Sequence, residues 1–310
     1  MYRGFPFSKV SDVLLHQMKW EWMLLSFVPG IMAQVFRGLR WHQSLSPIGE
    51  HSRISHCVYA VFVSYAASLV IPRIGEFVRC GILMRHDNID FSKALGTVVT
   101  ERVVDTVLVL LTVLIVFLSQ LHVFSVFFDM TGMSIEGTIS HFTGTGIFVT
   151  IACATGIAVL LFFLFRRLTF IRKVRSAFHG LIEGLLSIRN ISNVPLYIFY
   201  SIGIWVAYFL HYFLTFYCFD FTKDVGFTAG LVSFCVGTIA VIVPTPNGAG
   251  PWHFAVKTIL VLYGLSASNA IMFALIVHFV QTLLLVVLGI YALFMLSFHT
   301  PLKSRQNTKV

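Results

Sequence analysis

Charged residues are scarce in this sequence. Only 11% of the 310 residues are Asp, Glu, Lys or Arg, whereas 57% are hydrophobic and the mean hydropathy is +0.85. Soluble domains carry about 25% charged residues, so this composition indicates a polytopic membrane protein. At about 20 residues for each helical crossing, the apolar segments could supply about five to seven crossings. We therefore expect an all-α helical bundle in which residues 1–310 form a single integral membrane domain.

Motifs for nucleotide, metal and covalent chemistry are also missing. The sequence has no Walker loop, Rossmann glycine pattern, His-rich cluster or Ser-His-Asp order. Its five cysteines are scattered without the spacing of paired ligands, which favours buried free thiols over disulfides or a zinc site. We expect no cofactor and no metal, and a transporter is favoured over an enzyme.

Basic residues nevertheless outnumber acidic ones by 22 to 13, which gives a net charge of +9. They lie in short loops between apolar runs, as in the cytoplasmic loops of membrane proteins, so nucleic acid is not an expected partner. The most basic segment, residues 166–190, follows a span predicted over residues 145–165. Its apolar residues recur at helical spacing, which predicts an amphipathic helix whose residues 166–189 contact anionic lipids of the inner leaflet.

The distribution of charge among the loops predicts the orientation of the chain. Residues 121–142 contain no Lys or Arg, which is typical of an external loop. The first strong span is predicted to end at Phe36, and residues 37–53, with Arg37 and Arg40, are predicted to form a cytoplasmic loop. The pattern indicates a multi-pass protein of the plasma (inner) membrane with a cytoplasmic C-terminus.

Two short apolar segments are each interrupted by proline and followed by a short polar helix. The first pair covers residues 56–86 with Pro72 between its parts, and the second covers residues 227–263 with Pro244 between its parts. Such broken half-helices are typical of re-entrant hairpins. The same order of parts recurs in two segments, residues 20–120 and 193–298. Because the two hairpins would enter from opposite faces, we predict two inverted repeats.

Charged residues gather in the first hairpin and in a long helix predicted to begin at Phe91 with Asp90 as its N-cap. Charge inside an apolar span is costly, so such residues are functional candidates unless a structural partner satisfies them. These candidates are Arg73, Glu76, Arg79, Glu101, Arg102 and Asp105.

The spacing of these candidates predicts their roles. Arg73, Glu76 and Arg79 recur every three residues, so we expect them to share one helix face. The two arginines would clamp a lipid phosphate, and Glu76 would separate them or receive a cationic head group. Glu101 and Asp105 also share a face, and they could form an interhelix lock with the arginines, couple proton movement, or do both.

The turn of the second hairpin supplies a second set of candidates. Its glycines allow a close backbone approach, and free amides at the start of the next helix attract anions such as lipid phosphate. His253 and Lys257 are predicted to share a face of that helix. The candidates of this set are Asn247, Gly248, Gly250, Trp252, His253 and Lys257.

Three ordered motifs resemble the transmembrane region of the lysylphosphatidylglycerol synthase family. They are P-R-x-G-E-x-x-R at Pro72–Arg79, E-R-V-V-D at Glu101–Asp105 and P-x-G-x-G at Pro246–Gly250, and the likeness covers roughly residues 20–295. The resemblance implies a lipid translocase, similar to a flippase. Such a protein would handle a phospholipid or a polyprenyl-phosphate lipid at a polar site near the bilayer midplane.

Three differences from the family pattern bear on this expectation. No soluble catalytic domain follows the membrane part, which argues against lysyl transfer. His253 stands where the family usually has a glutamate, and the chain has one apolar span fewer at its start, which we expect to be truncated. The alternatives are an intramembrane transferase with Glu76, Glu101 or Asp105 as general base, and a noncatalytic scaffold for a soluble lipid-modifying enzyme. Whether the chain forms a homo-oligomer stays open.

Overall fold

The computed structural model describes residues 8–120, 191–243 and 245–298. All regular secondary structure in these residues is helical. Four helical segments are long and apolar enough to cross a membrane, namely Trp20–Ile48, Phe91–Ser119, Val194–Cys218 and Ala267–Phe298. The prediction of an all-helical membrane protein is therefore confirmed. The segments predicted as an external loop (121–142), a span (145–165) and an amphipathic helix (166–190) lie outside the described residues.

The helices fall into two groups along the chain. The first group comprises α1 (Ser8–Asp12), the π-helix η1 (Val13–Gln17), α2 (Trp20–Leu45), the 3-10 turn η2 (Ser46–Ile48), α3 (Ile54–Val70), α4 (Gly75–Asp87) and α5 (Phe91–Ser119). The second group comprises α10 (Val194–Phe213), the 3-10 helix η4 (Leu214–Cys218), α11 (Gly226–Ala240), the 3-10 turn η5 (Pro246–Gly248), α12 (Pro251–Leu262) and α13 (Ala267–Phe298).

Local signals in the sequence explain where several helices begin. The Asp90 carboxylate accepts hydrogen bonds from the backbone N–H groups of Ser92 (2.9 Å) and Lys93 (3.0 Å), which confirms it as the N-cap of α5. Helix α12 begins at Pro251, because a proline at the first helical position needs no hydrogen-bond partner for a backbone N–H. Capping and proline placement therefore set these boundaries locally.

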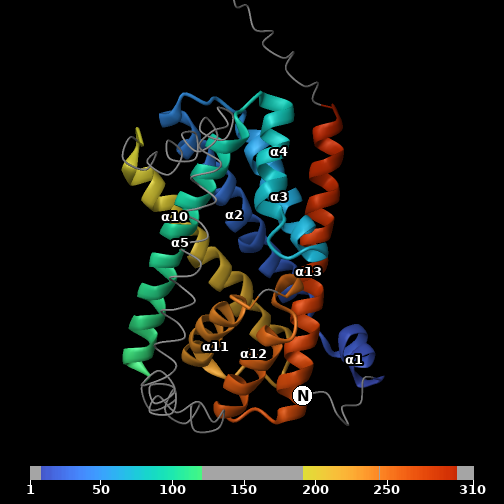
Figure 1. Ribbon diagram of the computed structural model, residues 1–310. Coiled ribbons are helices and arrows are strands. Elements are labelled where there is room, and N and C mark those ends of the chain that lie inside the picture. Colours follow the sequence, from blue (N-terminus) through green and yellow to red (C-terminus); the bar gives the residue numbers. More distant parts are fainter. Residues whose placement is uncertain (1–7, 121–190, 244, 299–310) are drawn as a thin grey trace, which may run out of the picture.

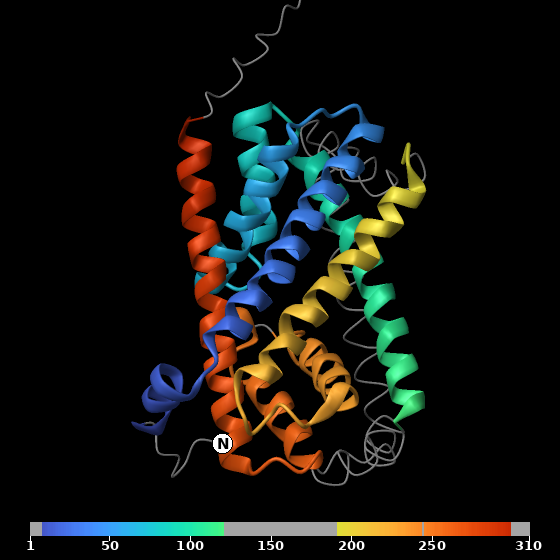
Figure 2. The same ribbon diagram turned by 180° about the vertical axis from the view of Figure 1, so that it is seen from behind.

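Two pairs of short helices lie in opposite halves of the bundle (Figure 1 and, from behind, Figure 2). The α3–α4 pair occupies the half that contains the end of α13, and the α11–α12 pair occupies the half that contains its start. Helices α2 and α10 cross between these pairs and pack extensively against each other. The turns of the two pairs meet, since Arg73 Nη2 donates to the carbonyl oxygen of Ile242 at 3.0 Å.

Helix α2 is longer than the sequence indicated. The span was predicted to end at Phe36, but α2 continues to Leu45, so residues 37–45 are helical and not part of a loop. Arg37 and Arg40 lie inside the bundle, with only 2% and 0% of their surface exposed. The loop prediction was wrong because Asp105 on α5 pairs with both arginines, which offsets part of the cost of burying them.

The start of α2 is joined to the end of η4 by backbone and side-chain contacts. The backbone N–H of Lys19 donates to the carbonyl oxygen of Cys218 at 2.8 Å. The Lys19 ammonium forms an exposed ion pair with Asp220 at 2.6 Å, and this hydrogen bond holds the pKa of the Asp220 carboxyl below its usual value. These contacts keep the start of α2 and the end of η4 together.

Candidate functional site

A group of five buried charged side chains joins α2, α4 and α5. Asp105 pairs with Arg37 (2.6 Å) and Arg40 (2.8 Å), and Glu101 pairs with Arg79 (2.9 Å) and Arg40 (3.4 Å). We call these five residues the buried cluster, since none of the side chains is more than 7% exposed. Each carboxylate lies between two guanidinium groups, so the removal of either carboxylate would leave its two arginines buried with less compensating charge.

Aromatic rings surround the arginines of the buried cluster. The Arg79 guanidinium lies 4.7 Å from the ring centroid of Trp41, within the range of a cation–π contact. The Arg37 guanidinium lies 6.0 Å from the ring centroid of Tyr65 and 5.9 Å from that of Tyr208. The Tyr208 hydroxyl donates to the Tyr65 hydroxyl at 2.9 Å, which orients both rings. These rings therefore pack against the guanidinium groups of Arg37 and Arg79 and help to hold them in place.

A half-exposed ion pair forms the edge of this group. Arg102 on α5 and Glu76 on α4 pair at 2.7 Å, and their side chains are 41% and 35% exposed. Arg102 also lies 3.7 Å from Asp105, so the edge is continuous with the buried cluster. Cluster and edge together contain four arginines and three carboxylates, which leaves one positive charge in excess. The excess belongs to the buried cluster, because Arg102 and Glu76 balance each other, and it favours an anion at the accessible edge beside the cluster.

The predicted clamp of Arg73 and Arg79 on one helix face was wrong. Helix α4 begins only at Gly75, and Arg73 lies in the preceding turn with a positive φ of 64°. The chain reverses direction between α3 and α4, so helical periodicity does not extend through Arg73. The two arginines also differ in burial, because Arg73 is exposed while Arg79 is buried against Glu101. That Arg79–Glu101 pair is the interhelix lock that the sequence allowed, and proton coupling stays a hypothesis.

The second set of candidates lies around Asn247 in the turn before α12. Asn247 and Gly248 both have positive φ, 50° and 72°. The Asn247 side chain donates from Nδ2 to Thr282 Oγ1 at 2.7 Å, and the backbone carbonyl oxygen of Asn247 accepts from His278 Nε2 at 3.0 Å. Because Thr282 and His278 belong to α13, these bonds attach the turn of the second hairpin to that helix.

Histidine and tryptophan occupy the start of α12. The rings of His253 and His278 lie 4.5 Å apart, and Trp252 lies 5.3 Å from His278. The sequence predicted that backbone amides at this helix start would be free to bind an anion. The prediction fails for Gly250, because its backbone N–H donates to His253 Nδ1 at 3.3 Å. Lys257 lies one turn beyond His253 and is half-buried. This set is therefore aromatic and hydrogen-bonded, in contrast to the charged first set.

The described residues do not include a group of three His, Cys, Asp or Glu side chains that could hold a metal ion. The carboxylates suggested as general bases are engaged with arginines, namely Glu76 with Arg102 and both others within the buried cluster. This geometry is that of an electrostatic scaffold with one accessible charged edge.

Comparison with protein-family models gives a match over residues 3–289 to the model described as the lysylphosphatidylglycerol synthase TM region. The chain belongs to this family. The assignment from the three sequence motifs is thereby confirmed, and it applies to the membrane region. Comparisons with curated proteins and with solved structures give no significant match.

The three motifs of this lysylphosphatidylglycerol synthase TM region mark the elements of the site. The motif at Pro72–Arg79 forms the first turn and the start of α4, and the motif at Glu101–Asp105 lies on α5 opposite it. The motif at Pro246–Gly250 forms the second turn, where η5 packs against α3. The family motifs are therefore the segments that carry the charged group and the meeting turns.

Arg37 and Arg40 are members of the site that sequence reasoning missed. Both were assigned to a loop, yet each binds a carboxylate of the Glu101–Asp105 motif. A signal was available: the two arginines lie three residues apart, which continues the helical register of the preceding span. Arginine is also a good helix former, so the basic residues alone did not require the helix to end.

Proposed function

We propose that this member of the lysylphosphatidylglycerol synthase TM region family is a lipid translocase, which moves a phospholipid or a polyprenyl-phosphate lipid between leaflets. The observation that carries the proposal is the half-exposed Arg102–Glu76 edge of the buried cluster. Exposed apolar side chains flank this edge, Phe77 on α4 and Val103 on α5. A lipid phosphate combines an anionic group with apolar chains, so its chemistry is complementary to this combination of surfaces.

The packing of the helices supports two inverted repeats with re-entrant hairpins. Helices α2–α5 and α10–α13 share one order, a long helix, a hairpin and a long helix, and the two sets run in opposite directions (Figure 1). The packing is reciprocal, because α13 contacts α3 of the first hairpin and α5 contacts α11 of the second. In transporters of this architecture the hairpins meet near the midplane, where substrate binds.

The charged ends of the bundle favour one orientation. The end formed by the start of α3, the end of α4 and the start of α5 carries Arg53, Arg85 and Lys93. Cytoplasmic loops are enriched in Lys and Arg, so we place this end, and with it the end of α13, in the cytoplasm. The membrane would be the plasma (inner) membrane, with anionic lipids as partners of residues 166–189.

The different burial of the ion pairs suggests how a phosphate would bind. An exposed ion pair contributes only about 0–1 kcal/mol, so a phosphate can readily compete with Glu76 for Arg102. The exposed Arg73 lies three residues before Glu76 and supplies a second guanidinium near the meeting turns. Arg79 acts as a positioning residue, because its partner Glu101 is fully buried. The movement of lipid would be passive or would be driven by an ion gradient.

The proposal is tested by lipid exchange in liposomes. The purified full chain is reconstituted with fluorescently labelled phosphatidylglycerol, and exchange is followed by chemical quenching of the outer leaflet. We expect Arg102→Gln to lower the exchange rate by about tenfold or more, because the phosphate loses a charge-assisted hydrogen bond. Arg73→Gln should lower the rate in the same direction.

The matched control is Lys223→Gln, which removes an exposed cation at the opposite end of the bundle. This variant should exchange lipid at the wild-type rate. Thermal unfolding of each variant establishes that the fold is intact. Wild-type exchange by folded Arg102→Gln and Arg73→Gln variants would contradict the translocase proposal.

A further inference from the structure

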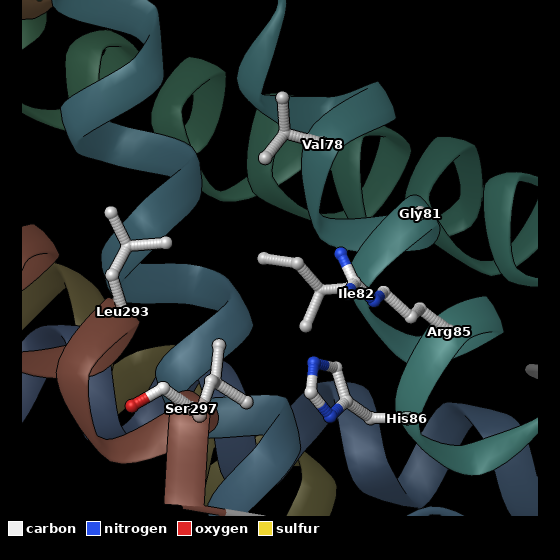
Figure 3. A pocket seen from close by; sticks show the side chains of 8 residues that line it. Val78, Gly81, Ile82, Arg85, His86, Leu293 and Ser297 are labelled. Carbon is white, nitrogen blue, oxygen red and sulfur yellow. The ribbon is translucent and has the colours of Figure 1, made fainter. Parts of the chain in front are cut away.

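A pocket of about 450 Å³ lies between the C-terminal half of α4 and the end of α13 (Figure 3). This volume falls in the range of about 300–1,000 Å³ that is typical of small-ligand sites. Val78 and Ile82 of α4 line one side, and Leu293 and Leu296 of α13 line the other. Figure 3 shows Ile82 extending from α4 toward Leu293 on α13. The walls are therefore apolar and come from both halves of the chain.

Polar groups gather at one end of this pocket. Arg85, His86 and Ser297 line that end, where α4 and α13 approach their last residues. Arg85 is exposed, and within the described part of the chain it forms no ion pair or hydrogen bond. A guanidinium presents paired donors that match phosphate oxygens. Arg85 lies in the last turn of α4, where a cation also interacts favourably with the helix dipole. This stabilising role explains a basic residue at position 85, but it does not explain the apolar pocket beside it.

Gly81 keeps this space open. A Cβ atom at Gly81 would have no heavy atom within 4 Å, and the backbone there is ordinary helix without a positive φ. Glycine inside a helix lowers its stability relative to alanine, and neither a turn nor close packing requires one at this position. The pocket therefore exists partly because a residue that lacks a side chain faces it.

We propose that this pocket binds an anionic phospholipid, with its phosphate at Arg85 and one acyl chain between α4 and α13. The exposed apolar side chains of Met84, Phe294 and Phe298 belong to the same two helices and are the sequence neighbours of the lining residues Arg85, Leu293 and Ser297, so a ligand can enter from the bilayer. Arg85 lies nine residues after Glu76 on α4, which is about 14 Å along the helix axis. The lipid site is thus separate from the proposed translocation edge, and it joins the first hairpin to the last helix of the second half.

Native mass spectrometry of the full chain tests this proposal. The protein is equilibrated with dioleoylphosphatidylglycerol or with dioleoylphosphatidylcholine, and retained lipid is measured as an adduct. The wild type should retain the anionic lipid in preference to the zwitterionic one. Gly81→Leu, which fills the pocket, and Arg85→Gln, which removes its cation, should each lower retention of the anionic lipid by about tenfold.

Three control variants make the result specific. Arg53→Gln removes another exposed arginine at the same end of the bundle and should retain lipid as the wild type does. Gly81→Ala should fold and retain lipid normally, because a methyl group leaves most of the pocket open. Arg102→Gln should lose lipid exchange but keep the adduct, which separates this site from the translocation edge.

The proposal is overturned by any of three results. These are equal retention of the two lipids by the wild type, unchanged retention by folded Arg85→Gln, and a change of oligomeric state in Gly81→Leu in place of lipid loss. The last result would show that the face contacts a second copy of the chain. Arg85 is exposed, so Arg85→Gln provides the test even if Gly81→Leu does not fold.

Discussion

Arg73 has a backbone conformation that residues with a side chain rarely adopt. Its φ of 64° lies in the left-handed region, which costs a residue with a Cβ atom roughly 1–2 kcal/mol. The side chain contacts the other hairpin through the Ile242 carbonyl oxygen. Strained residues of this kind persist where the surrounding structure requires them, and they are frequent at functional sites.

Glycine and alanine at position 73 separate the backbone strain from the side-chain function. Both variants lose the guanidinium, but only alanine keeps the unfavourable conformation. We expect Arg73→Gly to exceed Arg73→Ala in free energy of unfolding by about 1 kcal/mol, measured by denaturation in detergent. Both should lower lipid exchange equally. Equal stabilities would show that the turn is not left-handed in the membrane.

The Arg79–Glu101 pair should be strongly coupled in stability. Arg79→Leu leaves a fully buried carboxylate with Arg40 as its remaining partner, so we expect a destabilisation of about 3 kcal/mol. Glu101→Gln removes that charge, and the double variant should lose less stability than the sum of the single variants by about 1–3 kcal/mol. A double-mutant cycle on unfolding free energies measures this coupling, and a value near zero would contradict the lock.

Helix α4 contains two glycines with opposite surroundings. A Cβ atom at Gly75 would collide with the carbonyl oxygen of Ser64 on α3, whereas Gly81 has open space. We expect Gly75→Ala to destabilise the protein by about 1–3 kcal/mol through overpacking. Gly81→Ala should be neutral or stabilising by about 0.5–1 kcal/mol. Thermal unfolding of the two variants compares them, and a similar loss in both would argue against close α3–α4 packing.

The boundaries of the elements were largely predictable, with α2 as the exception. Asp90 and Pro251 act through capping and proline geometry, which depend on neighbouring residues alone. The end of α2 depends on partners that are remote in sequence, since Arg37 lies 68 residues before Asp105. A buried arginine and a loop arginine cannot be distinguished until such a partner is known.

In the inverted repeat that we propose, the two halves of the molecule share an arrangement but differ in chemistry. The Arg79–Glu101 pair joins α4 to α5, and at the corresponding place the His253 and His278 rings join α12 to α13. Reciprocal contacts of α13 with α3 and of α5 with α11 connect the halves. The charged contacts thus gather in the first half, and the second half supports the meeting turns with aromatic and hydrogen-bonding groups.

The inverted arrangement that we propose predicts that the two hairpins open to opposite sides of the membrane. Cysteines introduced singly at the exposed Asn88 and Asp224 should react with a membrane-impermeant maleimide from opposite sides. The native Cys57, Cys80, Cys218 and Cys235 are buried, and Cys153→Ser removes the fifth cysteine from the background. We expect position 88 to be protected in intact cells and position 224 to be labelled. Labelling of both from one side would exclude the inverted topology.

Composition was enough to indicate a helical membrane protein, three ordered motifs indicated its family, and the prolines marked the turns between its short helices. These properties are local in the chain, because hydrocarbon requires each backbone segment to satisfy its own hydrogen bonds. The division of the charged residues into buried partners and one accessible edge required the packed structure. Ion pairs such as Arg79–Glu101 and Arg37–Asp105 join residues 22 and 68 positions apart, and they form only where α2, α4 and α5 come together.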